Sequence, residues 1–409
     1  MHVVIFEDLR WTGLAPAALS RPVFCLASGM GTLLDKQVRA MKPSRLTLWV
    51  RPELVNFCRR HVLPTLKIPV EINVPLDDQP ALLVNGRTLC LGQSEIPREP
   101  AMAVDGHDLN AAYTVSPGLS PQDLMDRTAK ATKLLDLPRM QSLGRVASYL
   151  WDLIAWNEES LRHDAAAVAP RGQTKPAGPY HLVNDQAVSL GQNVTLSPGC
   201  VLDASGGPVV IADGAAIGAN AVVIGPCSIG PGTQISHLAL IRGGTSLGAR
   251  CKIGGEVSNT LFMDCSNKAH DGYVGDSYIG QWVNFGAGAA TSNLKNTYGP
   301  ISVRLGKQPI PTGRRFLGSL VGDHTKFAIS TRLMTGSYIG YCCMIAAGGL
   351  TPTHVPSFTF LTDQGSRNYE RDKAKEMMTS VFKRRQREWE AGDDEMMEYA
   401  AKGAAEVER

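Results

Sequence analysis

The sequence has few aromatic residues, little net charge and no long apolar run. Aromatic residues make up 6% of its 409 residues, and 41 Lys and Arg against 38 Asp and Glu leave a formal charge of +3. This balance gives no support to a dedicated nucleic-acid-binding protein. No apolar stretch approaches the roughly 18 residues that a membrane-spanning helix needs. We therefore expect no membrane insertion. We also expect no secretory signal, because the first eight residues carry no basic region and Glu7 and Asp8 interrupt their apolar run.

Cysteine is present, but not in a pattern that binds metal. The nine Cys include no CxxC and no Cys/His pair at zinc spacing, and their odd number does not suit a disulfide framework. We expect reduced thiols that pack in the interior of a cytoplasmic protein, and no metal site. Glycine is abundant at 41 residues, most of them beyond residue 170.

The first part of the chain alternates apolar runs with helix-like stretches, which predicts an α/β domain with a parallel sheet. Strands are expected at Val3–Phe6, Leu46–Val50, Val70–Ile72 and Ala81–Val84, with helices over 31–41 and 52–62. We place this α/β domain at residues 1–118, and a helical segment with an Ala/Pro/Gly-rich linker at 119–179.

A six-residue period then replaces the α/β pattern. Eight successive aliphatic residues recur at spacing six: Ile211, Ile217, Val223, Ile229, Ile235, Ile241, Leu247 and Ile253. Neither a helix, with period 3.6, nor a plain strand, with period 2, produces this repeat, whereas a hexapeptide parallel β-helix does. In such a fold the sixth residues stack inside, and each coil buries its face against its neighbours. We assign residues 180–357 to a β-helix and 358–409 to a helical tail.

Two basic segments leave alternatives open. Residues 296–315 interrupt the repeat and carry Arg304, Lys307, Arg314 and Arg315, so they form either a solvated loop or an arm that meets phosphate groups. The tail has a basic run over 383–387 followed by a largely acidic stretch. A surface or assembly helix is the main expectation for the tail, and binding of nucleic acid is a minor one.

One stretch carries a more specific motif. It contains Lys268–His270, Tyr273–Asp276, Val283–Gly288 and Thr291–Asn293. This stretch resembles the acetyltransferase domain of the bifunctional glucosamine-1-phosphate acetyltransferase/N-acetylglucosamine-1-phosphate uridyltransferase family and its sugar nucleotidyltransferase-like relatives. The resemblance covers residues 180–357 well and the first 115 residues loosely. It implies a left-handed β-helix, a homotrimer and acetyl-CoA as co-substrate.

The resemblance also implies roles for individual residues. His270 would be the general base that takes a proton from an amine, a task suited to a side chain that titrates near pH 7. The sugar phosphate would contact Tyr273 and Asn284, with Arg242 as its phosphate-binding arginine. Each of these also has a structural interpretation, such as a corner Asn that satisfies backbone groups. The residues expected at the acyl group and coenzyme A are Asn293, Ala287 and Ala347.

The chain departs from the family at Ser258, where a substrate-binding lysine is expected. This departure puts the identity of the accepted sugar in doubt. The amino-terminal part also resembles sugar-nucleotide pyrophosphorylases, through a Gly-rich loop at Gly29, Gly31 and Thr32 whose N–H groups would approach nucleotide phosphates. That loop lacks the usual arginine, because Leu33 takes its place.

A second departure is Arg87, which stands where the pyrophosphorylases have an aspartate that holds Mg²⁺. A cation at that position opposes metal binding, so Mg²⁺ is expected only if this domain is active. The leading hypothesis is acyl transfer from acetyl-CoA to an amino-sugar phosphate or amino-sugar nucleotide. The alternatives are nucleotidylyl transfer from UTP or dTTP by the first domain, and a non-catalytic trimeric assembly protein that binds a sugar nucleotide.

Overall fold

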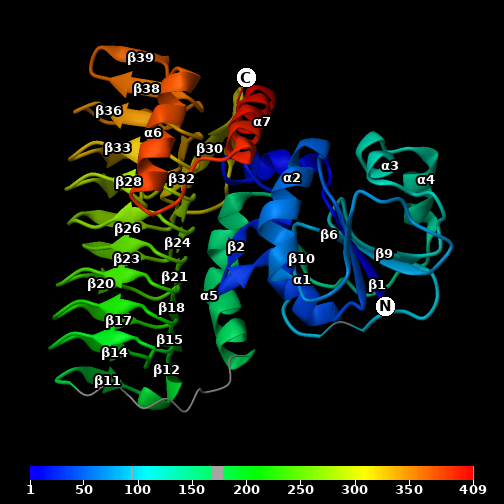
Figure 1. Ribbon diagram of the computed structural model, residues 1–409, viewed down its shortest axis with the longest axis horizontal. Coiled ribbons are helices and arrows are strands. Elements are labelled where there is room, and N and C mark those ends of the chain that lie inside the picture. The colour runs from blue at the N-terminus through cyan, green and yellow to red at the C-terminus, as the bar shows by residue number, and fades with distance from the viewer. Residues whose placement is uncertain (94, 168–177, 409) are drawn as a thin grey trace.

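The computed structural model describes residues 1–93, 95–167 and 178–408. An α/β domain lies on one side of the molecule and a β-helix on the other, with helix α5 (Leu150–Ala167) between them (Figure 1). Most of the predicted linker, residues 168–177, lies outside the described residues.

The amino-terminal domain is built on a six-stranded sheet in the order β5-β4-β1-β6-β9-β8. Its strands are β1 (His2–Phe6), β4 (Arg45–Trp49), β5 (Val70–Ile72), β6 (Ala81–Asn85), β8 (Ala101–Asp105) and β9 (Asp108–Thr114). The four strands predicted from the sequence are present and parallel. The expectation of a wholly parallel sheet is wrong, because β9 runs antiparallel to β6 and to β8. A tight turn at Gly106, with φ of 58°, joins β8 to β9 without a crossover helix.

Short helices and paired strands complete this domain. They are β2 (Ala27–Ser28), β3 (Gly31–Thr32), α1 (Leu33–Met41), α2 (Val55–Phe57), β7 (Thr88–Leu89), α3 (Pro121–Asp126), α4 (Ala129–Thr132) and β10 (Arg145–Val146). A capping box starts α1, since the Thr32 hydroxyl accepts from the Asp35 N–H and the Asp35 carboxylate accepts from the Thr32 N–H. The stretch 52–62, predicted as one helix, divides into a 3₁₀ turn, the short α2 and a π-helical turn.

The β-helix has three faces, each a parallel sheet. Face 1 consists of β11 (His181–Val183), β14 (Val201–Asp203), β17 (Val222–Ile224), β20 (Leu240–Ile241), β23 (Glu256–Ser258) and β26 (Tyr273–Gly275). Face 2 consists of β12 (Val188–Leu190), β15 (Val209–Ile211), β18 (Cys227–Ile229), β21 (Thr245–Leu247), β24 (Leu261–Phe262), β27 (Tyr278–Ile279), β32 (Ser319–Val321), β35 (Ser337–Ile339) and β37 (His354–Val355). Face 3 consists of β13 (Thr195–Leu196), β16 (Ala216–Ile217), β19 (Gln234–Ile235), β22 (Lys252–Ile253), β25 (Asn267–Lys268), β28 (Asn284–Phe285), β33 (Lys326–Phe327), β36 (Met344–Ala346), β38 (Thr359–Thr362) and the antiparallel β39 (Gly365–Asn368).

The predicted six-residue ladder forms the interior of these coils. All eight aliphatic residues from Ile211 to Ile253 are buried in one cluster. Face 3 shows the stacking directly, since Ile217 pairs with Ile235 and Ile235 with Ile253. The hexapeptide parallel β-helix is therefore confirmed. The turns that lead from a face-3 strand to the following face-1 strand are called the 3–1 corner below.

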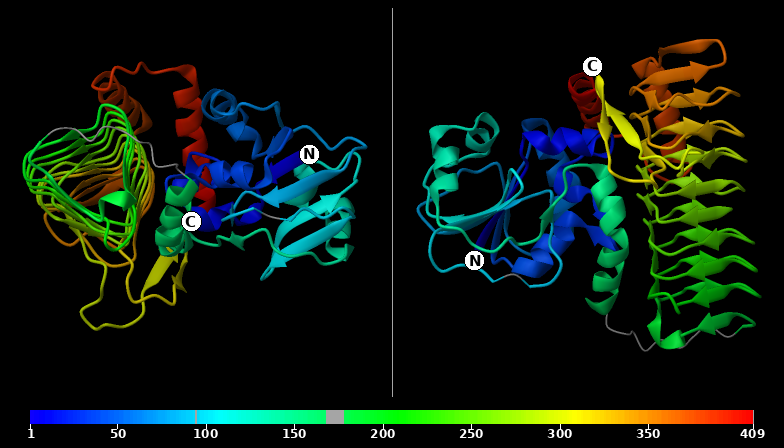
Figure 2. Two further views of the ribbon diagram at one scale, coloured as in Figure 1. Left: turned by 90° about the horizontal axis from the view of Figure 1, so that it is seen from below. Right: turned by 180° about the vertical axis from the view of Figure 1, so that it is seen from behind.

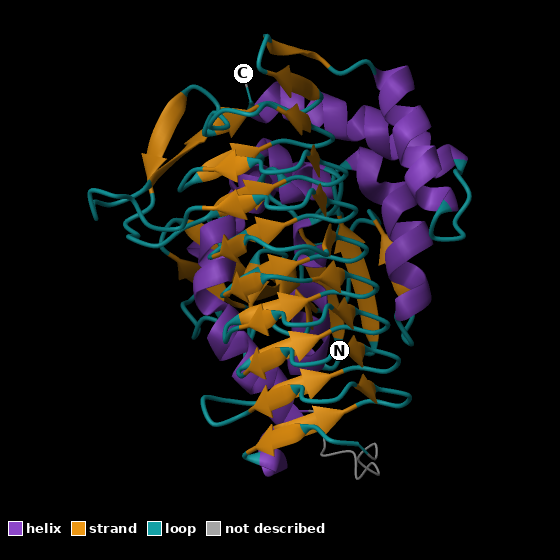
Figure 3. Cartoon of the chain, turned by 90° about the vertical axis from the view of Figure 1, so that its left-hand side faces the viewer, coloured by secondary structure: helices purple, strands orange, loops and turns teal. Residues whose placement is uncertain are grey.

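Face 2 is covered by the amino-terminal domain and α5. One hydrophobic cluster combines Trp11 and Leu153 with Tyr278 and Leu320 of this face. Polar contacts cross the same boundary: the Ala27 N–H donates to the Tyr278 hydroxyl at 2.7 Å, and the buried Arg21 pairs with Asp323. Figure 2 shows α5 running along the coils, whereas Figure 3 shows strands and loops, with few helices, on the side away from the domain.

The tail forms two helices, α6 (Arg371–Lys383) and α7 (Ala391–Val407). Phe382 of α6 packs on Trp282 at a centroid distance of 4.7 Å, and α7 contacts the amino-terminal domain. Basic and acidic side chains of the tail pair with each other, as Lys375 does with Asp394 at 2.6 Å. The nine cysteines are free, as predicted. No helix in the described ranges has the length and apolar character of a membrane span.

Candidate functional site

The predicted general base lies at the 3–1 corner, in the turn between β25 and β26. His270 and Asp271 are exposed there. Across the part of the chain that the structure describes, the exposed His270 imidazole makes no hydrogen bond or ion pair. The turn needs Gly272, with φ of 106°, because a Cβ at this position would lie 2.2 Å from the Ala289 carbonyl oxygen. The histidine therefore stands on a tightly determined turn.

Tyr273 lies next to this turn on face 1, within a network of polar side chains. The Asn293 side-chain amide donates to the Tyr273 hydroxyl at 2.9 Å and to the Asp276 carboxylate at 2.6 Å. Asn259 donates to the other Asp276 oxygen at 2.7 Å. Burial, together with the Asp276 carboxylate, raises the pKa of Tyr273 to about 12. The phenol consequently stays protonated at neutral pH, and its O–H can donate to a ligand while its oxygen accepts from Asn293.

The Tyr273 ring can lie in this position only because residue 275 is glycine. A Cβ on Gly275 would lie 2.0 Å from the Tyr273 hydroxyl oxygen. The quoted Tyr-Val-Gly-Asp motif therefore has a local physical basis, in which the glycine makes room for the ring and Asp276 holds Asn293. Asp276 and Asn259 are site residues that the sequence analysis did not assign, although Asp276 stood inside the quoted motif.

Arg242 is also on face 1, but its guanidinium already has a partner. Its Nε lies 2.9 Å from the Glu256 carboxylate, and both side chains are partly exposed. Leu240, Glu256 and Tyr273 are in register on successive coils, so Arg242 and Ser258 lie on the same face as Tyr273. A phosphate group that uses Arg242 has to compete with Glu256 or share the guanidinium with it.

The remaining predicted residues lie on the other side of the corner or above it. Asn284 is on face 3, in register with Asn267 and Lys326. Ala287 occupies the corner turn after β28, one coil above His270, and Ala347 follows β36 two coils further on. At a strand spacing of about 4.8 Å, Ala347 stands roughly 14 Å above His270 along the corner. His270, Tyr273 and Asn284 thus surround one corner, and the two alanines extend it upward.

The basic segment 296–315 folds back onto the molecule. It contains a hairpin of β30 (Ser302–Leu305) and β31 (Gln308–Pro311), and strands β29 (Ala290–Thr291) and β34 (Arg332–Leu333) pair beside its base. Val303 is buried in the cluster that covers face 2. Arg314 approaches Asp152 of α5 at 4.0 Å, whereas Arg304, Lys307 and Arg315 are exposed. The hairpin therefore packs toward the amino-terminal domain, away from the 3–1 corner.

The predicted nucleotide-binding loop of the first domain is occupied by side chains of α5. The Gly29 N–H donates to the Asn157 amide oxygen at 2.7 Å, and the Met30 N–H donates to the Asp164 carboxylate at 2.8 Å. A Cβ on Gly29 would lie 2.3 Å from Asp164. Thr32 is engaged in the capping box of α1. In this arrangement the backbone N–H groups of Gly29, Met30 and Thr32 already donate to side-chain oxygens of the protein, so they are not free to bind nucleotide phosphates.

Arg87 fills the place where the resemblance puts a magnesium-binding carboxylate. Its side chain is fully buried, and its Nη2 lies 2.6 Å from Asp8 and 3.1 Å from Asp108. Its Nη1 donates to the Ala147 carbonyl at 2.7 Å. Among the described residues no group of three His, Cys, Asp or Glu side chains is placed to hold a metal ion. A buried guanidinium that already binds both nearby carboxylates does not fit a Mg²⁺ site.

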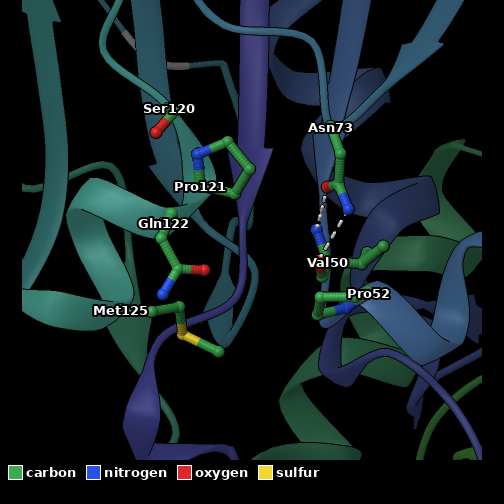
Figure 4. Close-up of a pocket in the computed structure, with 7 residues that line it drawn as sticks. All are labelled: Val50, Pro52, Asn73, Ser120, Pro121, Gln122 and Met125. Atoms are coloured by element: carbon green, nitrogen blue, oxygen red, sulfur yellow. Dashed lines mark hydrogen bonds between the residues drawn. The ribbon is translucent and has the colours of Figure 1, made fainter.

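A cavity of about 230 Å³ lies at the carboxyl ends of β4 and β5. Figure 4 shows Asn73, bonded to the main chain of Val50, on one side and Ser120, Pro121, Gln122 and Met125 on the other. None of its seven lining residues is charged, so this cavity offers no general acid or base.

Comparisons with known proteins match the two parts of the chain separately. Residues 3–171 match the family model described as sugar nucleotidyl transferase. Over 199 residues the chain is 34% identical to the bifunctional protein GlmU of Marinobacter nauticus, covering 47% of this chain and 40% of that protein. The resemblance seen in the sequence is confirmed. Over 108 residues the chain is 36% identical to a bifunctional sugar-1-phosphate nucleotidylyltransferase/acetyltransferase of Sulfurisphaera tokodaii, covering 26% of this chain and 27% of that protein.

A third relative, the GlmU protein of Synechococcus elongatus, is 30% identical over 195 residues, covering 44% of this chain and 39% of the relative. The chain thus spans about two fifths or less of the length of these curated relatives. Among solved structures, the Arabidopsis UDP-N-acetylglucosamine acyltransferase covers 48% of this chain and 75% of its own, at 13% identity and a TM-score of 0.21, which is too slight to carry an argument. The expected class, a transferase, is the class named for the family model.

Proposed function

We propose that this protein transfers an acyl group, most simply acetyl, from coenzyme A to the amine of an amino-sugar phosphate or amino-sugar nucleotide. The observation that carries the proposal is the exposed, unpartnered His270 imidazole at a corner flanked by Tyr273 and Asn284. A neutral imidazole nitrogen is suited to accept a proton from an attacking amine.

In the proposed reaction, the acceptor amine attacks the carbonyl carbon of the acyl thioester and His270 accepts the amine proton. A C–N bond forms, the C–S bond breaks, and the coenzyme A thiolate leaves and can be protonated from the imidazolium. The Tyr273 O–H, which stays protonated, is available to donate to the acceptor. Asn284 lies on face 3 one coil above, in register with Asn267, and we assign its amide to the same acceptor. Asn293 fixes the Tyr273 hydroxyl from behind.

The upward extension of the corner supports an elongated acyl donor. Ala287 and Ala347 are small residues on turns above His270, and Ala347 packs partly against the interior cluster, so neither side chain is large enough to block a chain molecule along the coils. We place the pantetheine arm of the acyl donor on this row, with the thioester toward His270. Its binding there is part of the proposal.

We further propose that the active form is a homotrimer. Face 2 is covered by the chain's own amino-terminal domain, and Arg385 of the tail donates to Asn267 of face 3 at 2.9 Å, so a second copy has face 1 and the 3–1 corner available. Leu238 and Ile329 on this corner are 76% and 73% exposed, and apolar groups of this size are often buried at subunit contacts. Sedimentation equilibrium is the direct measurement, and a purely monomeric protein would contradict the trimer proposal.

We also propose a cytoplasmic location, with which the free cysteines accord.

The test is thiol release from acetyl-CoA with glucosamine 1-phosphate and a panel of amino-sugar nucleotides as acceptors. His270→Ala is expected to lower the rate at least ~100-fold, the scale of a lost general base. His237→Ala is a matched control, since His237 is an exposed histidine on the same corner two coils below. Unchanged turnover in His270→Ala would refute the assignment.

A second candidate is nucleotidylyl transfer by the first domain, favoured by the family match over residues 3–171. Arg87 and the occupied Gly29 loop oppose the Mg²⁺-dependent form of this reaction. Pyrophosphate release from UTP or dTTP with a sugar 1-phosphate tests it. If neither reaction is detected in a verified trimer while a sugar nucleotide still binds, the non-catalytic assembly role becomes the better explanation.

A further inference from the structure

Lys268 occupies an interior position of the β-helix where its neighbours are apolar. It pairs with Ile253 of the coil below, and the pairing of Asn267 with Asn284 places it beside Phe285 of the coil above. Its residue exposure is 1%. Between Ile253 and Lys268 the coil is 15 residues long instead of 18, so counting in sixes from Ile253 does not reach this position.

The lysine amine is bonded to the main chain around the histidine turn. Its Nζ donates to the carbonyl oxygens of His270 at 2.8 Å, Asp271 at 3.0 Å and Gly254 at 3.1 Å. An ammonium group has three donors, and all of them are used. Two of the carbonyls belong to the turn that carries the imidazole, and the third belongs to the corner of the coil below.

We propose that Lys268 is a positioning residue for acyl transfer, which holds His270 through the carbonyls of His270 and Asp271. The inference rests on the proposed function, because it assigns Lys268 a role in that reaction. An apolar residue, as at Ile253, fills the interior but leaves the inward-facing carbonyls without a donor, which is costly in a buried place. With the ammonium removed, the turn is free to rotate these carbonyls toward solvent, and the imidazole moves with them.

The cost of burying an ammonium supports this assignment. Burial lowers the pKa of Lys268 to about 8, with the Asp271 carboxylate opposing that shift. A cation in an apolar column weakens the fold unless its hydrogen bonds compensate. The lysine lies two residues before the candidate base, where the carbonyls of the turn need a hydrogen-bond donor that an apolar side chain does not provide.

The chain provides a matched comparison in Lys326. This lysine lies on the same sheet and burial also lowers its pKa to about 8, but its amine donates to the Trp282 carbonyl. Trp282 lies at the turn between face 2 and face 3, on the other side of the coil from the His270 turn. Replacing either lysine with Met removes one buried ammonium and keeps the length of the side chain. Only the change at Lys268 releases the His270 turn.

The experiment compares Lys268→Met and Lys326→Met in acyl transfer and in the rate at which diethylpyrocarbonate modifies His270, with His237 as internal reference. We expect Lys268→Met to lower kcat at least ~10-fold with KM for acetyl-CoA within about twofold, since a displacement of about 1 Å can cost up to ~100-fold. The rate of His270 modification relative to His237 is expected to change at least ~3-fold, and Lys326→Met is expected to leave both readouts within about twofold.

Equal effects of the two Met variants, following their melting temperatures, would show that Lys268 only supports the fold and would overturn the proposal. If Lys268→Met does not fold, Lys268→Gln replaces it, with Lys326→Gln as its control. Because Gln keeps two of the three N–H donors, the expected fall in kcat is smaller, at least ~3-fold, and equal effects of the two Gln variants would overturn the proposal. Absence of acyl transfer in the unaltered protein would refute the proposed function instead. In that case the modification rate still decides whether Lys268 fixes the His270 turn.

Discussion

Charged and polar groups gather at two places in this molecule, and they are arranged in opposite ways. At the carboxyl ends of β1 and β6, Arg87 is fully buried and bonded to both Asp8 and Asp108. At the 3–1 corner, His270 is exposed and the Tyr273 phenol keeps its proton. The first cluster has used its hydrogen-bonding capacity internally, whereas the second keeps capacity for a ligand. Chemistry on a substrate requires the second condition.

The comparison also bears on the match of residues 3–171 to a sugar nucleotidyl transferase model. The sheet that supports such a site is present, but the loop amides at Gly29 and Met30 bind α5, and Arg87 binds the carboxylates. The same α5 bonds to the coils through Asn157, whose amide donates to the Gly244 carbonyl at 2.7 Å. Groups at the expected nucleotide loop thus join the two halves of the chain.

The largest expected effect is on the free energy of unfolding, which a substitution in the Arg87 cluster should change far more than one at the 3–1 corner. Arg87→Met leaves Asp8 and Asp108 without their buried cation, and breaking a buried ion pair in this way costs about 3–5 kcal/mol of unfolding free energy. His270→Ala removes an exposed side chain and is expected to change that free energy by no more than about 0.5 kcal/mol. Urea unfolding of both variants is the measurement.

Activity should show the reverse pattern. Below its unfolding transition, Arg87→Met is expected to keep acyl transfer within about twofold, while His270→Ala loses it. An Arg87→Met protein that is as stable as the original would contradict the view that the cluster is a closed ion-pair network. Loss of acyl transfer in a folded Arg87→Met protein would show that the reaction at the 3–1 corner depends on the Arg87 cluster.

The second prediction concerns the network behind Tyr273. Asn293→Ala removes the amide that donates to the Tyr273 hydroxyl and to Asp276. With hydrogen bonds to charged groups worth about 1.5–3 kcal/mol, we expect kcat/KM for the acceptor to fall roughly 10-fold. Steady-state kinetics with both substrates varied measures this. If only the KM for acetyl-CoA changes, Asn293 contacts the acyl donor, which is the role that the resemblance implied. In that case its hydrogen bond to Tyr273 is not what the acceptor depends on.

A smaller effect is expected from metal removal. Because Arg87 is buried and paired with Asp8 and Asp108 where the resemblance puts a Mg²⁺ ligand, acyl transfer with and without a chelator should agree within about twofold. Titration of Mn²⁺ followed by electron spin resonance should show no site tighter than about millimolar. A tight Mn²⁺ site that disappears with Asp8→Asn would show that the Arg87–Asp8 ion pair opens to admit a metal ion. Metal-dependent nucleotidylyl transfer would then again be a candidate function of the first domain.

The sequence was sufficient for the β-helix because its signal is local. Each interior residue repeats within its own coil, so the ladder from Ile211 to Ile253 could be counted without knowing any contact. The motif around His270 was equally local, and Tyr273 and Asn284, the residues that the resemblance assigned to the sugar phosphate, lie on neighbouring coils.

Features that depend on distant pairs were missed. Asp8 and Arg87 are 79 positions apart, and nothing near either residue indicates the other. The antiparallel β9 was missed because the Ala-rich run around Asn110–Ala112 has little alternation. The interior position of Lys268 was hidden by a coil three residues shorter than its neighbours, which moves the six-residue count out of phase.

The smallest predicted effect is a pH dependence of stability due to Lys268. Burial lowers its pKa from 10.5 to about 8 in the folded protein. Below pH 8 both the folded and the unfolded chain hold the proton, and the cost of the buried charge is fully present. Between about pH 8 and 10.5 the folded chain releases the proton while the unfolded chain keeps it, so this group adds stability as the pH rises. Above 10.5 the gain is complete.

Other buried groups, such as Tyr278, contribute pH dependence of their own, since burial raises its pKa. The difference between the original protein and Lys268→Met isolates the lysine. Across pH 8 to 10.5 this difference should move in favour of the original protein, with a slope that approaches one proton. Urea midpoints at several pH values measure it, and Lys326→Met should show the same trend because burial lowers that pKa equally. If only Lys326→Met shows the slope, the Lys268 amine is hydrated in solution, and its hold on the His270 turn is weaker than the three hydrogen bonds indicate.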